Sequence, residues 1–138
     1  MSKHYITVPN RANEISFYIE FGGTAVATVN TVINNAHKSR KFNFKKRSPY
    51  LLLFSRNKKS LIVVSHSDSV RLWVEKTLNE TGLEKIATET LFEPIIKFEE
   101  DGDSLKVELM FSMAFENKET IIAPVIEFLR KLTEFLEM

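Results

Sequence analysis

The chain has no cysteine, so disulfides, thiolate metal sites and cysteine nucleophiles are all excluded. It also lacks a long hydrophobic run: the two longest, residues 50–54 and 61–64, fall far short of the roughly 20 apolar residues that span a bilayer. The first ten residues contain no apolar stretch like the core of a signal peptide. Because the absence of cysteine also suits a reducing compartment, we expect a cytoplasmic protein.

No internal repeat, low-complexity tract or linker divides the 138 residues. Hydrophobic residues at 43% and charged residues at 27% are ordinary values for a globular protein, which excludes a disordered or fibrous class. A chain of this length buries one core comfortably and two with difficulty. We therefore expect a single domain over residues 1–138.

Acidic residues are missing from the long stretch 21–67, which carries nine lysines and arginines. From residue 68 onward acids outnumber bases by sixteen to eight, so the net charge of +1 hides a strong asymmetry along the chain. Such an asymmetry favours either a polyanionic partner or a contact of the protein with itself.

The basic segment 38–59 also contains aromatic residues, and this mixture predicts a contact with single-stranded RNA or DNA. Cations neutralise phosphates, while flat rings stack on unpaired bases and contribute about 1–3 kcal/mol per base. We therefore predict a small, non-catalytic nucleic-acid-binding protein. The predicted contact residues are Lys38, Arg40, Lys41, Phe42, Phe44, Lys45, Lys46, Arg47, Tyr50, Arg56, Lys58 and Lys59.

Other interpretations of the same segment stay open. In the simplest, Phe42 and Phe44 pack into the core and the cations only keep a loop in water. In another, the segment docks an acidic surface of a partner protein, as in an adaptor or inhibitor module. A small ribonuclease that uses His4, His37 or His66 as acid and base is a further alternative, because imidazole titrates near neutrality.

No other motif supports a catalytic residue, a cofactor or a metal ion, and none is predicted. His66, Ser67 and Asp68 are neighbours in sequence, whereas a catalytic triad needs groups that converge in space. The paired glycines at 22–23 precede a predicted helix, a place that can receive phosphate, but they lack Walker or GxGxxG spacing. The acids at 99–103 lack the spacing of an EF-hand loop, so we expect a solvated hairpin tip.

Hydrophobic periodicity predicts the elements of the N-terminal half. Residues 14–21 alternate strictly, which indicates a half-buried strand, and a shorter strand over residues 5–8 precedes it. Apolar residues at helical spacing predict a helix over residues 24–38, although its valines and threonines are weak helix formers. Residues 50–54 and 61–64 predict a hairpin of two buried strands.

Two further helices are predicted in the C-terminal half. The first is capped by Ser67 or Asp68 and stops at Gly82. The second begins near Thr120, and Pro124 is tolerated because it falls near the first turn. Its apolar stripe consists of Val125, Phe128, Leu129, Leu132, Phe135 and Leu136.

Between these helices, residues 91–116 predict a β-hairpin. A two-residue turn at Asp101 and Gly102 would place Phe98 opposite Leu105 and gather the apolar residues of both strands on one face. The first strand of this hairpin should lie at a sheet edge, because Pro94 donates no hydrogen bond to a neighbouring strand.

The predicted order ββαββαββα indicates an α+β fold, a two-layer sandwich of a mostly antiparallel sheet of about six strands with three helices. Part of this order, βαββαβ, fits a ferredoxin-like core with an extra strand and a C-terminal helix. That core leaves no edge beside its first strand for residues 5–8, so six antiparallel strands in another order are the alternative.

Two predicted surfaces of the protein could bind a second copy of the chain and form a homodimer. Residues 22–37 carry no charge, and the centres of protein interfaces are depleted in charge. The apolar stripe of the C-terminal helix would also be exposed if the other helices fill the sheet face. A second copy or another protein is therefore a candidate partner, and no membrane contact is expected.

Overall fold

The computed structural model of the protein describes residues 2–22, 25–47, 59–90, 92–113 and 118–137. Over these residues the chain forms an α+β fold with seven strands, three α-helices and one short 3-10 helix. The elements are β1 (Ser2–Asn10), β2 (Asn13–Phe21), β3 (Ala25–Ile33), η1 (Lys38–Arg40), β4 (Asn43–Lys46), β5 (Leu61–Val64), α2 (Asp68–Thr81), α3 (Leu83–Glu89), β6 (Ile95–Asp101), β7 (Ser104–Met113) and α4 (Lys118–Glu137).

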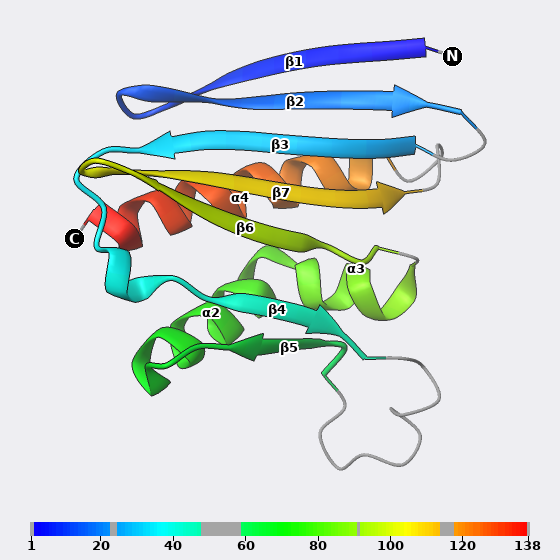
Figure 1. Cartoon of the computed structure of the whole chain (residues 1–138). Helices are drawn as coiled ribbons and strands as arrows, with labels where there is room; N and C mark the ends of the chain where they lie inside the picture. The colour runs from blue at the N-terminus through cyan, green and yellow to red at the C-terminus, as the bar shows by residue number, and fades with distance from the viewer. Residues whose placement is uncertain (1, 23–24, 48–58, 91, 114–117, 138) are drawn as a thin grey trace.

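Five strands form one antiparallel sheet in the order β1-β2-β3-β7-β6, and β4 and β5 form a separate antiparallel pair (Figure 1). The predicted α+β class is therefore confirmed. The ferredoxin-like order does not appear among the described residues, because the first three strands follow one another as a meander in place of a βαβ unit.

The helix predicted over residues 24–38 is wrong, since residues 25–33 form the central strand β3. Its burial alternates, with Ala25, Val29 and Ile33 among the residues on the core side. These positions are spaced by four, which imitates a helix, but the residues between them continue a period of two. Six of the nine residues are β-branched and pack well in a sheet, and pairing with both β2 and β7 holds them there.

The hairpin of β6 and β7 forms as predicted, but the predicted pairing is two residues off. The turn lies at residues 102–103, so Phe98 faces Val107 and not Leu105. Gly102 has a φ of 60°, a left-handed conformation that glycine adopts without steric cost. A shift of two residues keeps each side chain on its predicted face. The prediction that the first strand lies at a sheet edge is confirmed, because β6 is the last strand of the sheet.

The predicted helix boundaries are close to those observed. The Ser67 hydroxyl accepts a hydrogen bond from the Val70 amide and caps α2, while Gly82, with a φ of 85°, ends it. A second short helix, α3, follows Gly82 directly and was not expected. α4 begins at Lys118, two residues before the predicted start, so Pro124 lies inside the helix.

All three α-helices lie on one face of the sheets (Figure 1). α4 buries most of its apolar stripe there, and the partly buried Phe135 stacks on Trp73 of α2 with ring centroids 4.0 Å apart. The stripe is therefore part of the core. The opposite face of the five-stranded sheet carries no helix among the described residues and is open.

Candidate functional site

Phe42 and Phe44, the two aromatic residues in the middle of the predicted nucleic-acid site, are buried in the core. Only 4% and 6% of their surfaces are exposed. The Phe42 ring packs against Phe44 and, edge to face, against Phe98 of β6, with centroids 5.9 Å and 5.3 Å apart. In this arrangement neither ring offers a face for base stacking.

The buried phenylalanines follow from the local strand. Residues 43–46 form β4, where Phe44 points into the core while Asn43 and Lys45 point outward. β4 pairs with β5, which matches the strand predicted at residues 61–64. The prediction that this strand is buried is wrong in part, because Ile62 and Val64 are 38% and 52% exposed. The strand expected at residues 50–54 lies outside the described residues, as do the predicted contacts Tyr50, Arg56 and Lys58.

Most of the described cations of the basic segment have partners within the protein. Lys38 donates to the carbonyl of Gly102, and Arg40 donates to the carbonyl of Phe135 while its guanidinium lies 4.9 Å from that ring. These contacts hold η1 against the β6–β7 turn and against α4, so both cations stabilise the packing of the protein itself.

Two lysines of the segment form ion pairs with acids of the C-terminal half. The Lys41 Nζ atom lies 3.2 Å from Oε1 of Glu100, and the Lys59 Nζ atom lies 3.3 Å from Oε2 of Glu75. Part of the basic segment therefore pairs with the acidic C-terminal half of the same molecule. A contact of the protein with itself was one of the two alternatives that the charge asymmetry favoured.

Lys45, Lys46 and Arg47 differ in their surroundings. Lys46 donates to the carbonyl of Thr90 at 2.8 Å; burial lowers its pKa below the ordinary value of 10.5, and the charge of Glu93 opposes that shift. The Arg47 amide donates to the carbonyl of Ser60 at 2.7 Å. Lys45 is exposed and has no hydrogen bond or ion pair within the described residues.

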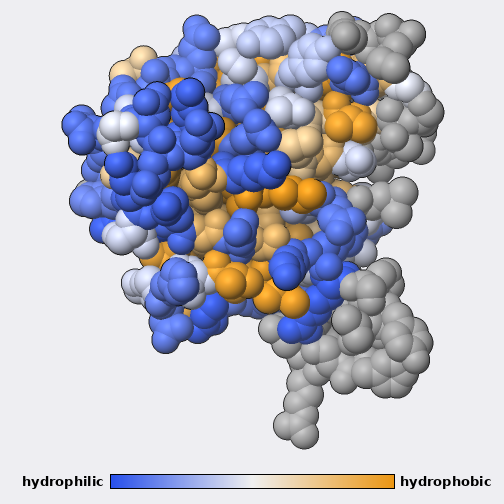
Figure 2. Space-filling model, viewed as in Figure 1, coloured by the Kyte–Doolittle hydropathy of each residue, from blue (hydrophilic) through white to orange (hydrophobic). Residues whose placement is uncertain are grey.

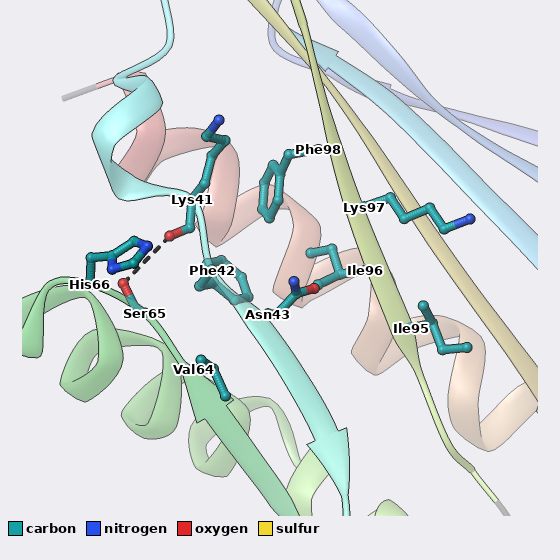
Figure 3. Close-up of a pocket in the computed structure, with 10 residues that line it drawn as sticks. All are labelled: Lys41, Phe42, Asn43, Val64, Ser65, His66, Ile95, Ile96, Lys97 and Phe98. Carbon is teal, nitrogen blue, oxygen red and sulfur yellow. Dashed lines mark hydrogen bonds between the residues drawn. The ribbon is translucent and has the colours of Figure 1, made fainter.

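A groove of about 780 Å³ separates the β4–β5 pair from β6 (Figure 3). Its floor is apolar, because the rings of Phe42 and Phe98 meet there beside Ile96. The exposed Val64 and Ile95 stand on opposite sides of it, on β5 and β6.

Each long side of this groove is the edge of a sheet. β6 pairs only with β7, and β4 pairs only with β5. No backbone hydrogen bond joins β4 to β6 within the described parts of the chain, so the outward amides and carbonyls of both strands face the groove without a strand partner. Unpaired edges of this kind readily accept an additional strand.

The lining of the groove contains no acidic residue, although it contains Lys41, Lys97 and His66. The Lys41 ammonium is occupied by Glu100 at one end. Lys97 is exposed and its ammonium points away over β7, while Lys45 is exposed on the adjacent β4 (Figure 3 shows Lys97). The lining itself is therefore weakly positive around an apolar floor, and two exposed acids, Glu99 and Glu100, follow it on β6.

Sequence reasoning found Lys41 and Phe42 but missed the other side of the groove. Ile95 and Lys97 come from a hairpin some fifty residues later, and only the packing of β6 beside β4 brings them close. The predicted hairpin register gathers Ile96 and Phe98 on the core side, which leaves Ile95 and Lys97 on the other face, but no local signal says which element lies next to it.

The other candidate sites do not assemble. Residue 25 begins a strand, so no helix N-terminus follows the glycines at 22–23. The Ser67 hydroxyl is used as a helix cap, and the three histidines lie in β1, before η1 and after β5 with no hydrogen bond between them among the described residues. No group of three or more His, Asp or Glu side chains in the described chain is arranged to hold a metal ion.

None of the described helices is both long enough and apolar enough to cross a membrane. Comparisons of the chain with protein-family models, with curated proteins and with solved structures found no match.

Proposed function

We propose that this protein is a non-catalytic interaction module that binds an extended, acidic segment of a partner protein in the groove between β4 and β6. The observation that carries the proposal is the pair of unpaired strand edges that face each other across an apolar floor. It develops the adaptor interpretation of the basic segment, with β6 added to the site.

An extended segment fits this groove because both kinds of contact are available to it. Its backbone would hydrogen-bond to the free edge of β4 or β6, as in other cases of strand addition. Alternate side chains would then contact the exposed Val64 and Ile95 and the half-buried Phe98, or point outward toward the exposed Lys45. The expected ligand therefore alternates apolar and acidic residues.

Nucleic-acid binding, the first prediction from the sequence, is supported less well. Its stacking rings are buried, and Lys38, Arg40 and Lys41 already have partners. A polyanion also gains nothing from an apolar floor or from unpaired backbone edges, whereas a peptide gains from both.

The test is fluorescence polarisation with a labelled eight-residue peptide of alternating valine and glutamate. Two control peptides replace every glutamate by lysine, or every second valine by proline, which has no amide hydrogen. We expect the acidic peptide to bind and both controls to bind at least tenfold more weakly. Equal binding of the acidic and basic peptides, or no binding of the acidic one, contradicts the proposal.

Protein variants then locate the site. Reversing Lys45 and Lys97 together to glutamate should weaken the acidic peptide about tenfold, because two exposed charge pairs of roughly 0.2–1 kcal/mol each become repulsions. Reversal of Lys85, an exposed lysine of α3, is the matched control and should leave the affinity unchanged. If a single-stranded oligonucleotide binds instead, with a slope near −3 in log K against log salt for about four phosphates, the nucleic-acid prediction is the correct one.

A further inference from the structure

β4 and β6 run in opposite directions on the two sides of the groove (Figure 1). At one end, the ion pair of Lys41 with Glu100 joins the residues just before β4 to the end of β6. At the other end, Lys46 of β4 donates to the carbonyl of Thr90, which precedes β6. Some Cα atoms of the two strands lie within 8 Å of each other. The strands therefore have the relative direction of neighbours in an antiparallel sheet.

The backbone of β4 offers unpaired groups on the side of β6. The Arg47 amide donates to the carbonyl of Ser60, which makes these two residues a hydrogen-bonded pair of the β4–β5 ladder. Hydrogen-bonded pairs alternate along an antiparallel ladder, so the residues that bond to β5 are 43, 45 and 47. The residues between them, Phe42 and Phe44 included, direct their amides and carbonyls away from β5 and toward β6.

The backbone of β6 offers matching groups on the side of β4. Asp101 and Ser104 flank the two-residue turn of the β6–β7 hairpin and form its closing hydrogen-bonded pair. By the same alternation, residues 95, 97 and 99 bond to β7. Ile96 and Phe98 therefore direct their amides and carbonyls away from β7 and toward β4.

The side chains show which of these residues lie opposite each other. The rings of Phe42 and Phe98 meet across the groove with centroids 5.3 Å apart (Figure 3), which sets these two residues opposite each other. In antiparallel strands Phe44 is then opposite Ile96. In both pairs the free backbone groups of one residue face those of the other, and all four side chains lie in or against the core.

The outer face agrees with this register. It places Lys41 opposite Glu99, which carry opposite charges, and Asn43 opposite Lys97, so no like charges are directly opposed. Figure 2 shows apolar surface across the middle of the molecule, bordered by hydrophilic residues. Direct pairing of β4 with β6 would remove part of the apolar groove floor from water, which favours that pairing.

We propose that β4 and β6 alternate between the groove seen here and a closed state in which they pair directly. In the closed state the seven strands of the described residues form one antiparallel sheet in the order β1-β2-β3-β7-β6-β4-β5. A segment inserted between β4 and β6 needs about 9.6 Å between them, twice the usual spacing of about 4.8 Å, so the closed state excludes it. β4 is then an internal competitor that regulates the groove; this competition rests on the proposed function, whereas the closure does not.

Cross-linking tests the closure, because the chain has no cysteine that would interfere with an engineered pair. Asn43→Cys with Lys97→Cys places two thiols directly opposite each other in the closed state, with Cα atoms about 4.5 Å apart, which a disulfide can bridge. The matched control is Lys45→Cys with Glu99→Cys, whose exposed positions are four residues out of register, about 13 Å along the strands.

In oxidised glutathione, mass spectrometry should show the intramolecular disulfide of the first pair forming at least tenfold faster than that of the control pair. If circular dichroism shows that the first variant does not fold, Lys45→Cys with Ile95→Cys, the next opposed pair of the same register, replaces it. Equal rates for the opposed pair and the control, or no disulfide in the opposed pair, overturn the closure.

The peptide of alternating valine and glutamate tests the competition. At saturation it should slow the disulfide between residues 43 and 97 at least tenfold, and the oxidised variant should bind it at least tenfold more weakly than the same variant after reduction. Equal affinity of the two forms overturns the competition. If neither wild type nor the reduced variant binds the peptide, the proposed function fails and the competition with it, while the disulfide rates still decide the closure.

Discussion

Replacing Phe42 by alanine tests whether this ring belongs to the core or to a binding surface. The ring is 4% exposed and touches the rings of Phe44 and Phe98. Alanine would give up roughly 120 Å² of buried apolar surface, which at about 25 cal/mol per Å² corresponds to about 3 kcal/mol. The cavity left behind brings the expected loss in the free energy of unfolding to about 3–5 kcal/mol.

Urea denaturation measures this loss. With a slope of about 2 kcal/mol per M for a small domain, the midpoint should fall by about 2 M. Phe42→Leu keeps most of the packing and should lose less than about 1.5 kcal/mol, and Lys45→Ala on the exposed side of β4 should change the free energy by less than about 0.5 kcal/mol.

The opposite outcome is equally informative. If the free energy of unfolding of Phe42→Ala lies within about 1 kcal/mol of the wild-type value, the ring is not packed as described. Its availability for stacking on bases then has to be reconsidered. A coupling energy of about 0.5–1.5 kcal/mol between Phe42 and Phe98 in a double-mutant cycle would support the observed ring contact independently.

Two further predictions concern buried polar groups. Because burial lowers the pKa of Lys46 in the folded state despite the opposing charge of Glu93, the unfolded chain binds more protons between the lowered pKa and 10.5, and stability contributed by Lys46 rises with pH there. Urea titrations at several pH values between the lowered pKa and 10.5 test this. The free energy of unfolding of wild type minus that of Lys46→Met should increase with pH, and a difference that stays constant contradicts the lowered pKa of Lys46. The Asn10 amide nitrogen donates to the hydroxyls of Thr31 and Thr133 at 3.2 Å and 2.9 Å. In thermal unfolding, Asn10→Ala should therefore lower the free energy of unfolding by about 1–3 kcal/mol, and Thr133→Val by about half as much. A loss below about 0.5 kcal/mol for Asn10→Ala contradicts this role.

The Asn10 contacts also explain how the N-terminal hairpin is attached to the rest of the molecule. Asn10 ends β1, Thr31 belongs to β3 and Thr133 belongs to α4, and all three are buried. Arg130 adds a hydrogen bond to the carbonyl of Pro9. The hairpin is therefore held by side-chain contacts as well as by its pairing with β3.

The error at β3 shows a limit of periodicity in a single sequence. Small and β-branched residues fill almost every position from 25 to 33, so both a period of two and a spacing of four find apolar residues. The helix prediction for this segment conflicted with its weak helix propensity, and the propensity was the better guide. Pairing with β2 and β7 then decides the matter, because a central strand satisfies its backbone on both sides.

The register of the β6–β7 hairpin shows a similar limit. Asp101 and Gly102 have the composition of a two-residue turn, and Gly102 does adopt the left-handed conformation. The turn nevertheless uses Gly102 and Asp103, because the hydrophobic pattern repeats every two residues and is satisfied equally after a shift of two.

From the sequence alone we predicted the α+β class, the alternating strands β2 and β7, the short apolar strand β5, a cap of α2 at Ser67 or Asp68 with a stop at Gly82, and the apolar stripe of α4. These features depend on residues near one another in the chain, where propensity and periodicity act. Tertiary packing buries Phe42 and Phe44, pairs Lys41 with Glu100 and sets β4 beside β6 across a groove. Those contacts join residues about fifty or sixty positions apart, and burial and charge pairing depend on which surfaces meet, which local sequence does not specify.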